Sequence, residues 1–207
     1  MKKHFLLLGL ALCAHASSAQ LTGGIKAGIN VAQLFAEAQG ESETTDMVVG
    51  FQLGGYLNHS FSEKIVFQPE LIFSRVGGKD SEYDPDLQDE IGVQFKFDYL
   101  AIPLNIKFKI NDNFGILAGP QVGYLAGAKT KIDLFGTSVT VDVKDQFKAL
   151  DLGANLGLSY TINKIGIDLR YFLGFSNIAD IDDPDVSDAT IKNRTFSLTV
   201  NYQLFEK

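Results

Sequence analysis

His59 is the first residue to consider as a catalytic group, because hydroxyl nucleophiles usually need a histidine as general base. The other two histidines, His4 and His15, lie in an expected leader segment. His59 falls in a short connection, where we interpret it as an exposed turn residue. No serine and aspartate can be placed with it at one end of the expected fold. We therefore predict no catalytic residues and expect that the protein is not an enzyme.

Two acidic runs could bind a hard cation such as Ca²⁺, which takes several carboxylate ligands. They are Asp80-x-Glu82-x-Asp84-x-Asp86 and Asp180-x-Asp182-Asp183-x-Asp185. Neither run has the spacing of an EF-hand loop, with its central glycine and terminal glutamate. We interpret both as solvated acidic loops, and we expect no metal site and no cofactor. Weak divalent bridging to lipopolysaccharide phosphates is the alternative.

Six ionisable residues alternate with apolar neighbours and are expected to face one enclosed space. They are Lys26, Glu70, Lys107, Asp151, Asp168 and Arg170. Buried charges are tolerated only when they are paired and hydrogen-bonded. Because three are positive and three are negative, we predict a structural polar network. A gate or narrow ion path is the alternative.

The elements that would position these residues are β-strands, because apolar residues recur with a period of two. In the last segment Phe196, Leu198, Val200, Tyr202 and Leu204 share one face, and we expect this strand to direct membrane insertion. Eight such segments are predicted, at about 23–31, 48–60, 64–76, 93–109, 114–128, 148–161, 165–175 and 194–205.

The connections between the segments alternate in length. Three are short, at 59–64, 111–113 and 163–164, and four are long, at about 32–47, 77–92, 129–147 and 176–193. This rhythm predicts an all-β fold, an eight-stranded antiparallel up-and-down transmembrane β-barrel with three short periplasmic turns and four longer external loops. The first, second and fourth long loops are acidic.

The two faces of the last three segments decide which side meets lipid. One face carries bulky apolar side chains, and the other carries glycine and small polar residues. An eight-stranded barrel has room only for modest side chains inside, so the bulky face is expected to meet lipid. A soluble barrel that binds an apolar ligand is the less favoured alternative.

The fourth segment changes phase along its length. Phe95, Phe97 and Tyr99 are odd-numbered, whereas the apolar residues Leu104 to Ile110 are even-numbered. A strand changes the parity of its faces by inserting an extra residue. We therefore predict a β-bulge between Tyr99 and Pro103.

Residues 1–19 are predicted to form a cleaved signal peptide, and residues 20–207 a single barrel domain. Lys2 and Lys3 precede a short apolar run, and Ser17-Ser18-Ala19 offers a cleavage site. Acylation of Cys13, the only cysteine, is the alternative. The net charge of −7 among 207 residues argues against a nucleic-acid partner, because phosphate binding needs basic patches.

The stretch Tyr99-Leu100-Ala101-Ile102-Pro103-Leu104, the export signal and the alternating last strand resemble the small outer-membrane β-barrel family of the Bacteroidetes type, which includes PorT-like proteins. The resemblance covers essentially the whole mature chain. It implies a bacterial outer-membrane location, with membrane lipid and the barrel insertion machinery as partners. The architecture also resembles the OmpA and OmpX barrels.

The leading functional hypothesis is a non-enzymatic outer-membrane barrel with a plugged polar lumen. Its acidic external loops would contact a surface or an envelope partner. A narrow porin or transport barrel is the first alternative. The resemblance implies a second, a component of a PorT-like secretion system.

Overall fold

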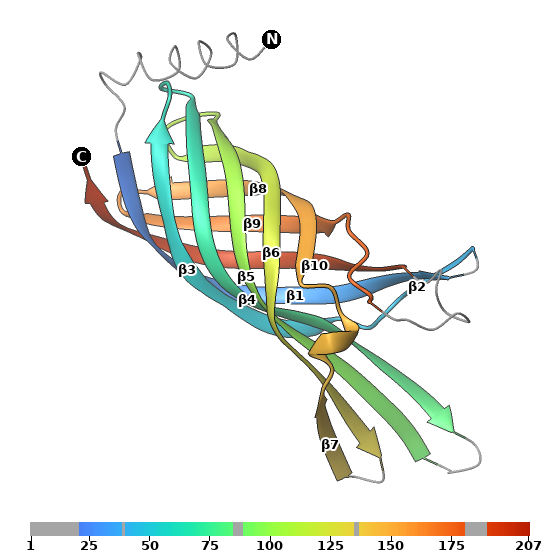
Figure 1. Ribbon diagram of the computed structural model, residues 1–207. Coiled ribbons are helices and arrows are strands. Elements are labelled where there is room, and N and C mark those ends of the chain that lie inside the picture. The colour runs from blue at the N-terminus through green and yellow to red at the C-terminus, as the bar shows by residue number, and fades with distance from the viewer. Residues whose placement is uncertain (1–20, 39, 85–88, 135–136, 181–189) are drawn as a thin grey trace.

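Ten β-strands form one antiparallel sheet in the computed structural model of the chain (Figure 1). The structure describes residues 21–38, 40–84, 89–134, 137–180 and 190–207. The predicted signal peptide lies outside these residues. The elements are β1 (Leu21–Ala38), β2 (Glu41–Thr44), β3 (Val48–Ser60), β4 (Ile65–Asp84), β5 (Asp89–Lys109), β6 (Phe114–Leu134), β7 (Thr137–Asp142), the 3₁₀ turn η2 (Lys144–Gln146), β8 (Leu150–Ile162), β9 (Ile165–Gly174) and β10 (Thr190–Glu206). No helix in the described ranges is long and apolar enough to cross a bilayer.

Eight of these strands close into a ring. The order β10-β9-β8-β6-β5-β4-β3-β1 is completed by pairing of β10 with β1, from Thr22 opposite Glu206 to Glu37 opposite Thr190. The short strands β2 and β7 add only to β1 and β6. Closure leaves no free strand edge along the ring. The predicted antiparallel up-and-down barrel is confirmed.

The three predicted short turns lie together at one end of the barrel (Figure 1). They occupy residues 61–64, 110–113 and 163–164. In the tightest of them Asn163 has φ 52°, a left-handed conformation that asparagine tolerates better than most residues. The prediction for His59 was wrong, because His59 belongs to β3, is half-buried and lies edge-on to Phe61 with ring centroids 5.0 Å apart.

Alternate side chains meet opposite surroundings along the ring strands. In β9, exposed and buried residues alternate almost without interruption. The outward side chains are large and apolar, whereas many inward ones are polar, as expected for a barrel with lipid outside. All five residues predicted for the insertion strand point outward on β10 and are exposed: Phe196, Leu198, Val200, Tyr202 and Leu204.

The first three long connections are shorter than predicted, because much of their expected length is β-structure. Pairing of β4 with β5 continues to Asp84 opposite Asp89, and β6 continues to Leu134 before β7 pairs back on it. β6 therefore has 21 residues and β9 only 10. A tilted strand crosses a bilayer in roughly 9–11 residues. The longer strands project beyond the ring as a sheet, seen below and to the right in Figure 1.

The bulge was predicted in the wrong strand. In β5 the odd-numbered side chains stay inward from Phe97 through Asn105, so the faces of this strand do not exchange. The extra residue is Ala126 in β6, between Leu125 opposite Tyr99 and Gly127 opposite Asp98. The apolar residues of β5 change parity for another reason: its first aromatic residues line the interior instead of facing lipid.

Candidate functional site

Four charged side chains meet inside the barrel, and we call them the ionic layer: Lys26, Glu70, Asp168 and Arg170. Arg170 donates two parallel hydrogen bonds to Glu70, at 2.6 Å and 2.8 Å, and a third to Asp168 at 2.7 Å. The ammonium of Lys26 lies 2.9 Å from Glu70 and 3.2 Å from Asp168. Because β4 and β9 are not neighbours in the ring, the bond between Glu70 and Arg170 crosses the lumen.

Neutral side chains complete the coordination of Glu70. Gln68 donates to its Oε1 at 2.6 Å, and Asn105 donates to the same oxygen at 3.3 Å. Both amides are buried. Charges removed from water are stabilised only when their remaining bonding capacity is used, and a bidentate pair of arginine and carboxylate is among the strongest ways to use it. The layer can therefore hold four charges in a narrow interior.

The structure brings together four of the six predicted network residues and leaves two apart. Lys107 lies toward the short-turn end and makes no hydrogen bond or ion pair with any described residue. Asp151 lies toward the opposite end, where Asn193 donates to it at 2.8 Å and Ser176 at 3.1 Å. Hydrogen bonds and ion pairs thus join four of the six residues directly, while Asp151 bonds to a separate set of polar side chains.

Above the ionic layer, toward the external end, an apolar cluster fills the lumen. We call it the aromatic cap: Phe97, Leu125, Phe147 and Ile178. Phe97 and Phe147 pack in a T-shaped pair with ring centroids 4.7 Å apart. Three of the four are fully buried, and Phe147 is nearly so. Phe147 and Ile178 come from the connections that follow β7 and β9, so these connections fold into the mouth of the barrel.

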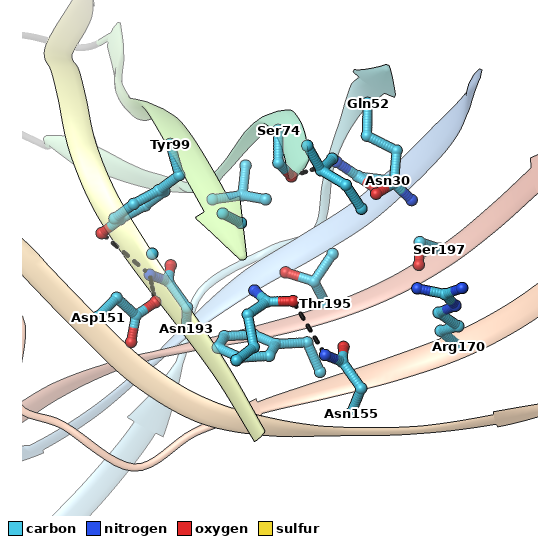
Figure 2. Close-up of a pocket in the computed structure, with 16 residues that line it drawn as sticks. Asn30, Gln52, Ser74, Tyr99, Asp151, Asn155, Arg170, Asn193, Thr195 and Ser197 are labelled. Carbon is cyan, nitrogen blue, oxygen red and sulfur yellow. Dashed lines mark hydrogen bonds between the residues drawn. The ribbon is translucent and has the colours of Figure 1, made fainter. Parts of the chain in front are cut away.

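A small polar chamber separates the two layers (Figure 2). Its volume is about 40 Å³, and its lining includes Tyr99 on the cap side and Arg170 on the ionic side. Asn193 donates to both the Tyr99 hydroxyl, at 3.3 Å, and Asp151. Since one buried water needs roughly 10–15 Å³ of such space, the chamber holds a few waters at most.

Sequence reasoning missed the cap and the amides that bind the charges. The bulge prediction treated the first aromatic residues of β5 as part of the same face as the apolar residues from Leu104 to Ile110. Gln68 and Asn105 carried a usable signal, because each lies at an inward position in phase with a predicted network residue. Phe147 and Ile178 carried none, since they lie outside the alternating segments.

The strands that project beyond the ring form a second candidate site, the external sheet, which comprises β7 and residues 77–84, 89–96 and 127–134. Val93, Ile132 and Val139 lie side by side across three of its strands. With Val141 they form one face, the apolar strip, in which Ile132, Val139 and Val141 are exposed at 37%, 55% and 46%.

The opposite face of the external sheet is charged. It carries Lys96 directly opposite Lys129, and Lys129 opposite Asp142. On the same face Lys131 donates to Asp133 at 2.9 Å. This hydrogen bond holds the pKa of the Asp133 carboxyl below its usual range, with help from Ser138. The sheet is therefore amphipathic.

Metal ligation has no support within the described residues, which contain no group of three histidine, cysteine, aspartate or glutamate side chains that could hold an ion. The acidic run from Asp180 lies mostly at 181–189, outside the described residues.

Comparisons with known proteins agree with this architecture. Residues 16–180 match the family model described as outer membrane protein beta-barrel domain. No curated protein sequence matches the chain. Among solved structures, the Neisserial surface protein A is 14% identical, with a TM-score of 0.51, and the match covers 87% of this chain and 97% of that one.

Two further solved structures are similar to the chain at lower TM-scores. The attachment invasion locus protein Ail of Yersinia pestis is 19% identical with a TM-score of 0.47, and the match covers 90% of this chain and 99% of that one. OprG of Pseudomonas aeruginosa is 14% identical with a TM-score of 0.40, and the match covers 90% of this chain and 95% of that one. These likenesses concern the fold alone. Because the family model matches most of its residues, this chain belongs to the outer membrane protein beta-barrel domain family and is a β-barrel of the bacterial outer membrane.

Proposed function

We propose that this protein is a non-enzymatic, closed barrel whose function is to contact an extracellular protein through the apolar strip of its external sheet. The observation that carries the proposal is the exposure of Ile132, Val139 and Val141 on strands that continue past the ring. Contiguous apolar surface outside a bilayer is costly to leave in water and marks interaction sites.

The position of the strip supports an extracellular partner. β6 continues nine residues beyond Leu125, the last residue before its bulge. At about 3.3 Å per residue, this length reaches roughly 30 Å. In addition, β7 pairs only with β6 among the described strands. Its outer edge therefore offers unpaired backbone groups beside the apolar strip, and edges of this kind accept an added strand.

The closed lumen supports contact over transport. The ionic layer and the aromatic cap both lie across the bore, and eight strands leave little free diameter. The predicted acidic contacts remain a second part of the proposal, because Glu37, Glu41 and Glu43 are exposed at the tip of the hairpin between β1 and β2. The PorT-like secretion role stays a prediction, since no described feature favours it.

Site-specific photo-crosslinking tests the proposal. A photoreactive residue is placed at Val139, on the apolar strip, and separately at Thr140, on the other face of the same strand. Cells that normally make the protein are irradiated. We expect one discrete adduct from position 139 and none from position 140. Identical adduct patterns from the two positions, or no adduct from 139, would contradict the proposal. A heat-modifiable gel band confirms that each variant is folded.

A further inference from the structure

An open apolar groove crosses the lipid-facing wall of the ring at β3 and β4. Its volume is about 650 Å³. It lies where the outward positions of the two strands are Gly55 and Pro69, between larger side chains. Those larger side chains form its sides: Leu53, Leu57, Leu71, Phe73 and Leu100. A groove left empty would lose dispersion contacts, so a hydrocarbon chain from the surrounding membrane is its natural occupant.

Basic residues lie on the external side of this groove. Its upper rim is a row of paired outward positions, Leu53, Phe73 and Leu100, which Tyr124 continues on β6. Beyond this row the charged face of the external sheet begins. Four basic residues lie there: Arg75, Lys96, Lys129 and Lys144. Aromatic and basic side chains at such a boundary meet lipid headgroups.

Lys96 and Lys129 hold positive charge that the sheet does not neutralise, and we call them the lysine pair. They are exposed and lie directly opposite each other on β5 and β6, an arrangement that is unfavourable for like charges. Neither ammonium forms a hydrogen bond or an ion pair with any described residue. On β4 the position beside Lys96 is Gly77. The lysine pair is therefore open on the side that lies above the groove.

The acidic residues of this face do not close the lysine pair. Two of them already have partners, Asp98 with Arg75 and Asp133 with Lys131. Asp142 lies opposite Lys129, but on β7, away from the groove, and its carboxylate accepts the backbone N–H of Lys144 at 3.0 Å. Asp145, also beyond β7, is exposed and forms no ion pair within the described ranges.

The dimensions connect the lysine pair to the groove. Leu100 and Lys96 are four residues apart on β5, which corresponds to roughly 13 Å along the strand. Lysine stems can bend toward a membrane surface and shorten this distance. A single lipid whose headgroup lies at the lysine pair can therefore place an acyl chain in the groove.

A phosphate monoester is the headgroup that suits two adjacent ammonium groups. It carries a charge of about −1.5 to −2 at neutral pH, whereas the phosphodiester of a common phospholipid carries one negative charge. Attraction grows with the product of the charges. Lipid A, the glycolipid of the external leaflet, combines such phosphates with several acyl chains.

We propose that this wall of the barrel binds one molecule of a lipid A-type glycolipid, with a phosphate monoester at the lysine pair and one acyl chain in the groove over Gly55. The inference is independent of the protein contact proposed above, because the apolar strip lies on the opposite face of the external sheet.

Native mass spectrometry of the full chain in detergent micelles tests the proposal. Lipid A is the probe, and we expect saturable binding of one molecule. Dephosphorylated lipid A and phosphatidylglycerol are the comparison lipids, and each should bind with a Kd at least about tenfold higher. Phosphatidylglycerol binding as tightly as lipid A would overturn the proposal, because a general attraction of anionic lipids would then be sufficient.

A double variant tests the lysine pair. Lys96→Gln combined with Lys129→Gln should raise the Kd for lipid A at least about tenfold, because both ammonium groups that meet the phosphate are lost. The matched control removes two lysines from the short turns, Lys64→Gln with Lys164→Gln, and changes the net charge equally. It should bind lipid A as the wild type does. Equal weakening by the two double variants would contradict a specific site.

Gly55→Leu tests the groove without changing any charge. A Cβ at position 55 comes within 3.4 Å of the backbone oxygen of Gly24 and meets no other described atom within 4 Å, so we expect a folded, heat-modifiable protein. Its added side chain should weaken binding of both lipid A and dephosphorylated lipid A several-fold. Wild-type affinity in the folded variant would overturn the proposal. Should Gly55→Leu fail to fold, the lysine variants alone decide.

Discussion

The ionic layer and the aromatic cap close the same lumen with opposite chemistry. The layer consists of four charges that stand on ring strands and bond across the bore in fixed directions. The cap is held by packing, and two of its members come from connections outside the ring. The difference indicates that the layer has little freedom to adjust when one member is lost. The cap can close partly around a gap.

The largest effect is expected from Glu70→Ala, which breaks the layer at its centre. Arg170 and Lys26 would each lose a charged partner while remaining buried. Removing one member of a buried ion pair typically costs about 3–5 kcal/mol, and we expect a loss of this size in the free energy of unfolding. Denaturant titration in lipid bilayers measures it.

A matched control for this prediction is the ion pair between Arg75 and Asp98, whose nitrogen and oxygen are 2.7 Å apart but partly exposed to solvent. Asp98→Asn should cost less than about 1 kcal/mol, as is usual for surface pairs. If Glu70→Ala and Asp98→Asn cost the same, the ionic layer is not the buried centre described here.

The next effect is expected from Phe97→Ala, which removes the largest fully buried side chain of the cap. Such truncations cost about 3–5 kcal/mol, depending on how far the surroundings relax. Because Phe147 and Ile178 belong to connections that can shift, we expect the free energy of unfolding to fall by about 3 kcal/mol, the lower end of this range. The same denaturant titration measures it. A loss greater than that of Glu70→Ala would reverse our ranking of the two layers.

Deletion of Ala126 should affect the external sheet and leave both layers intact. At the bulge, the inward residues of β6 change from odd to even numbers. Without Ala126, residues 127–134 can keep their pairs on β5, but the bend and the stronger twist that a bulge gives to its strand are lost. We expect the pairing of β6 with β7 to lose about 1–2 kcal/mol. Amide hydrogen exchange should accelerate in 127–134 but not in β8 or β9. Equal acceleration throughout the barrel would show that the two parts are not independent.

The smallest effect is expected from Asp133→Asn, the exposed counterpart of the buried charges. Lys131 lowers the pKa of this carboxyl, so its contribution to stability is present above the ordinary aspartate pKa and is lost as pH falls through the lowered value. The group is solvent-exposed, and exposed pairs contribute little. We expect no measurable change in melting temperature for the variant at neutral pH. A clear decrease would mean that the external sheet depends on this pair.

How much of this could be predicted from the sequence differs between the two layers. Lys26, Asp168 and Arg170 interrupt apolar alternation, so parity alone assigned them to the interior. The alternation did not show which side Phe97 faces, because an aromatic side chain fits either a lipid-facing surface or a packed lumen. The side becomes clear only once the strands close into a ring. Ala126 looked like any other small residue of β6, and its extra position became visible only from the pairing register.

The candidate sites show the same contrast between features that lie within one strand and features that depend on several strands. The ring strands were predicted because each predicted segment alternates over nine or more residues. The external sheet was not, since Val93, Ile132 and Val139 are far apart in sequence and form a strip only after three strands pair. Lys107 was assigned to a balanced network from charge counting. Its separation from the ionic layer depends on depth in the barrel, which sequence alternation does not encode.

Single-channel recording in planar bilayers tests the central claim most directly, namely that two independent layers close the lumen. The wild-type protein should insert, as judged by its heat-modifiable band, and show no stepwise conductance. Phe97→Ala should behave in the same way, because the ionic layer still crosses the bore. Reproducible conductance steps from the folded wild-type protein would contradict the account and favour a narrow transport barrel.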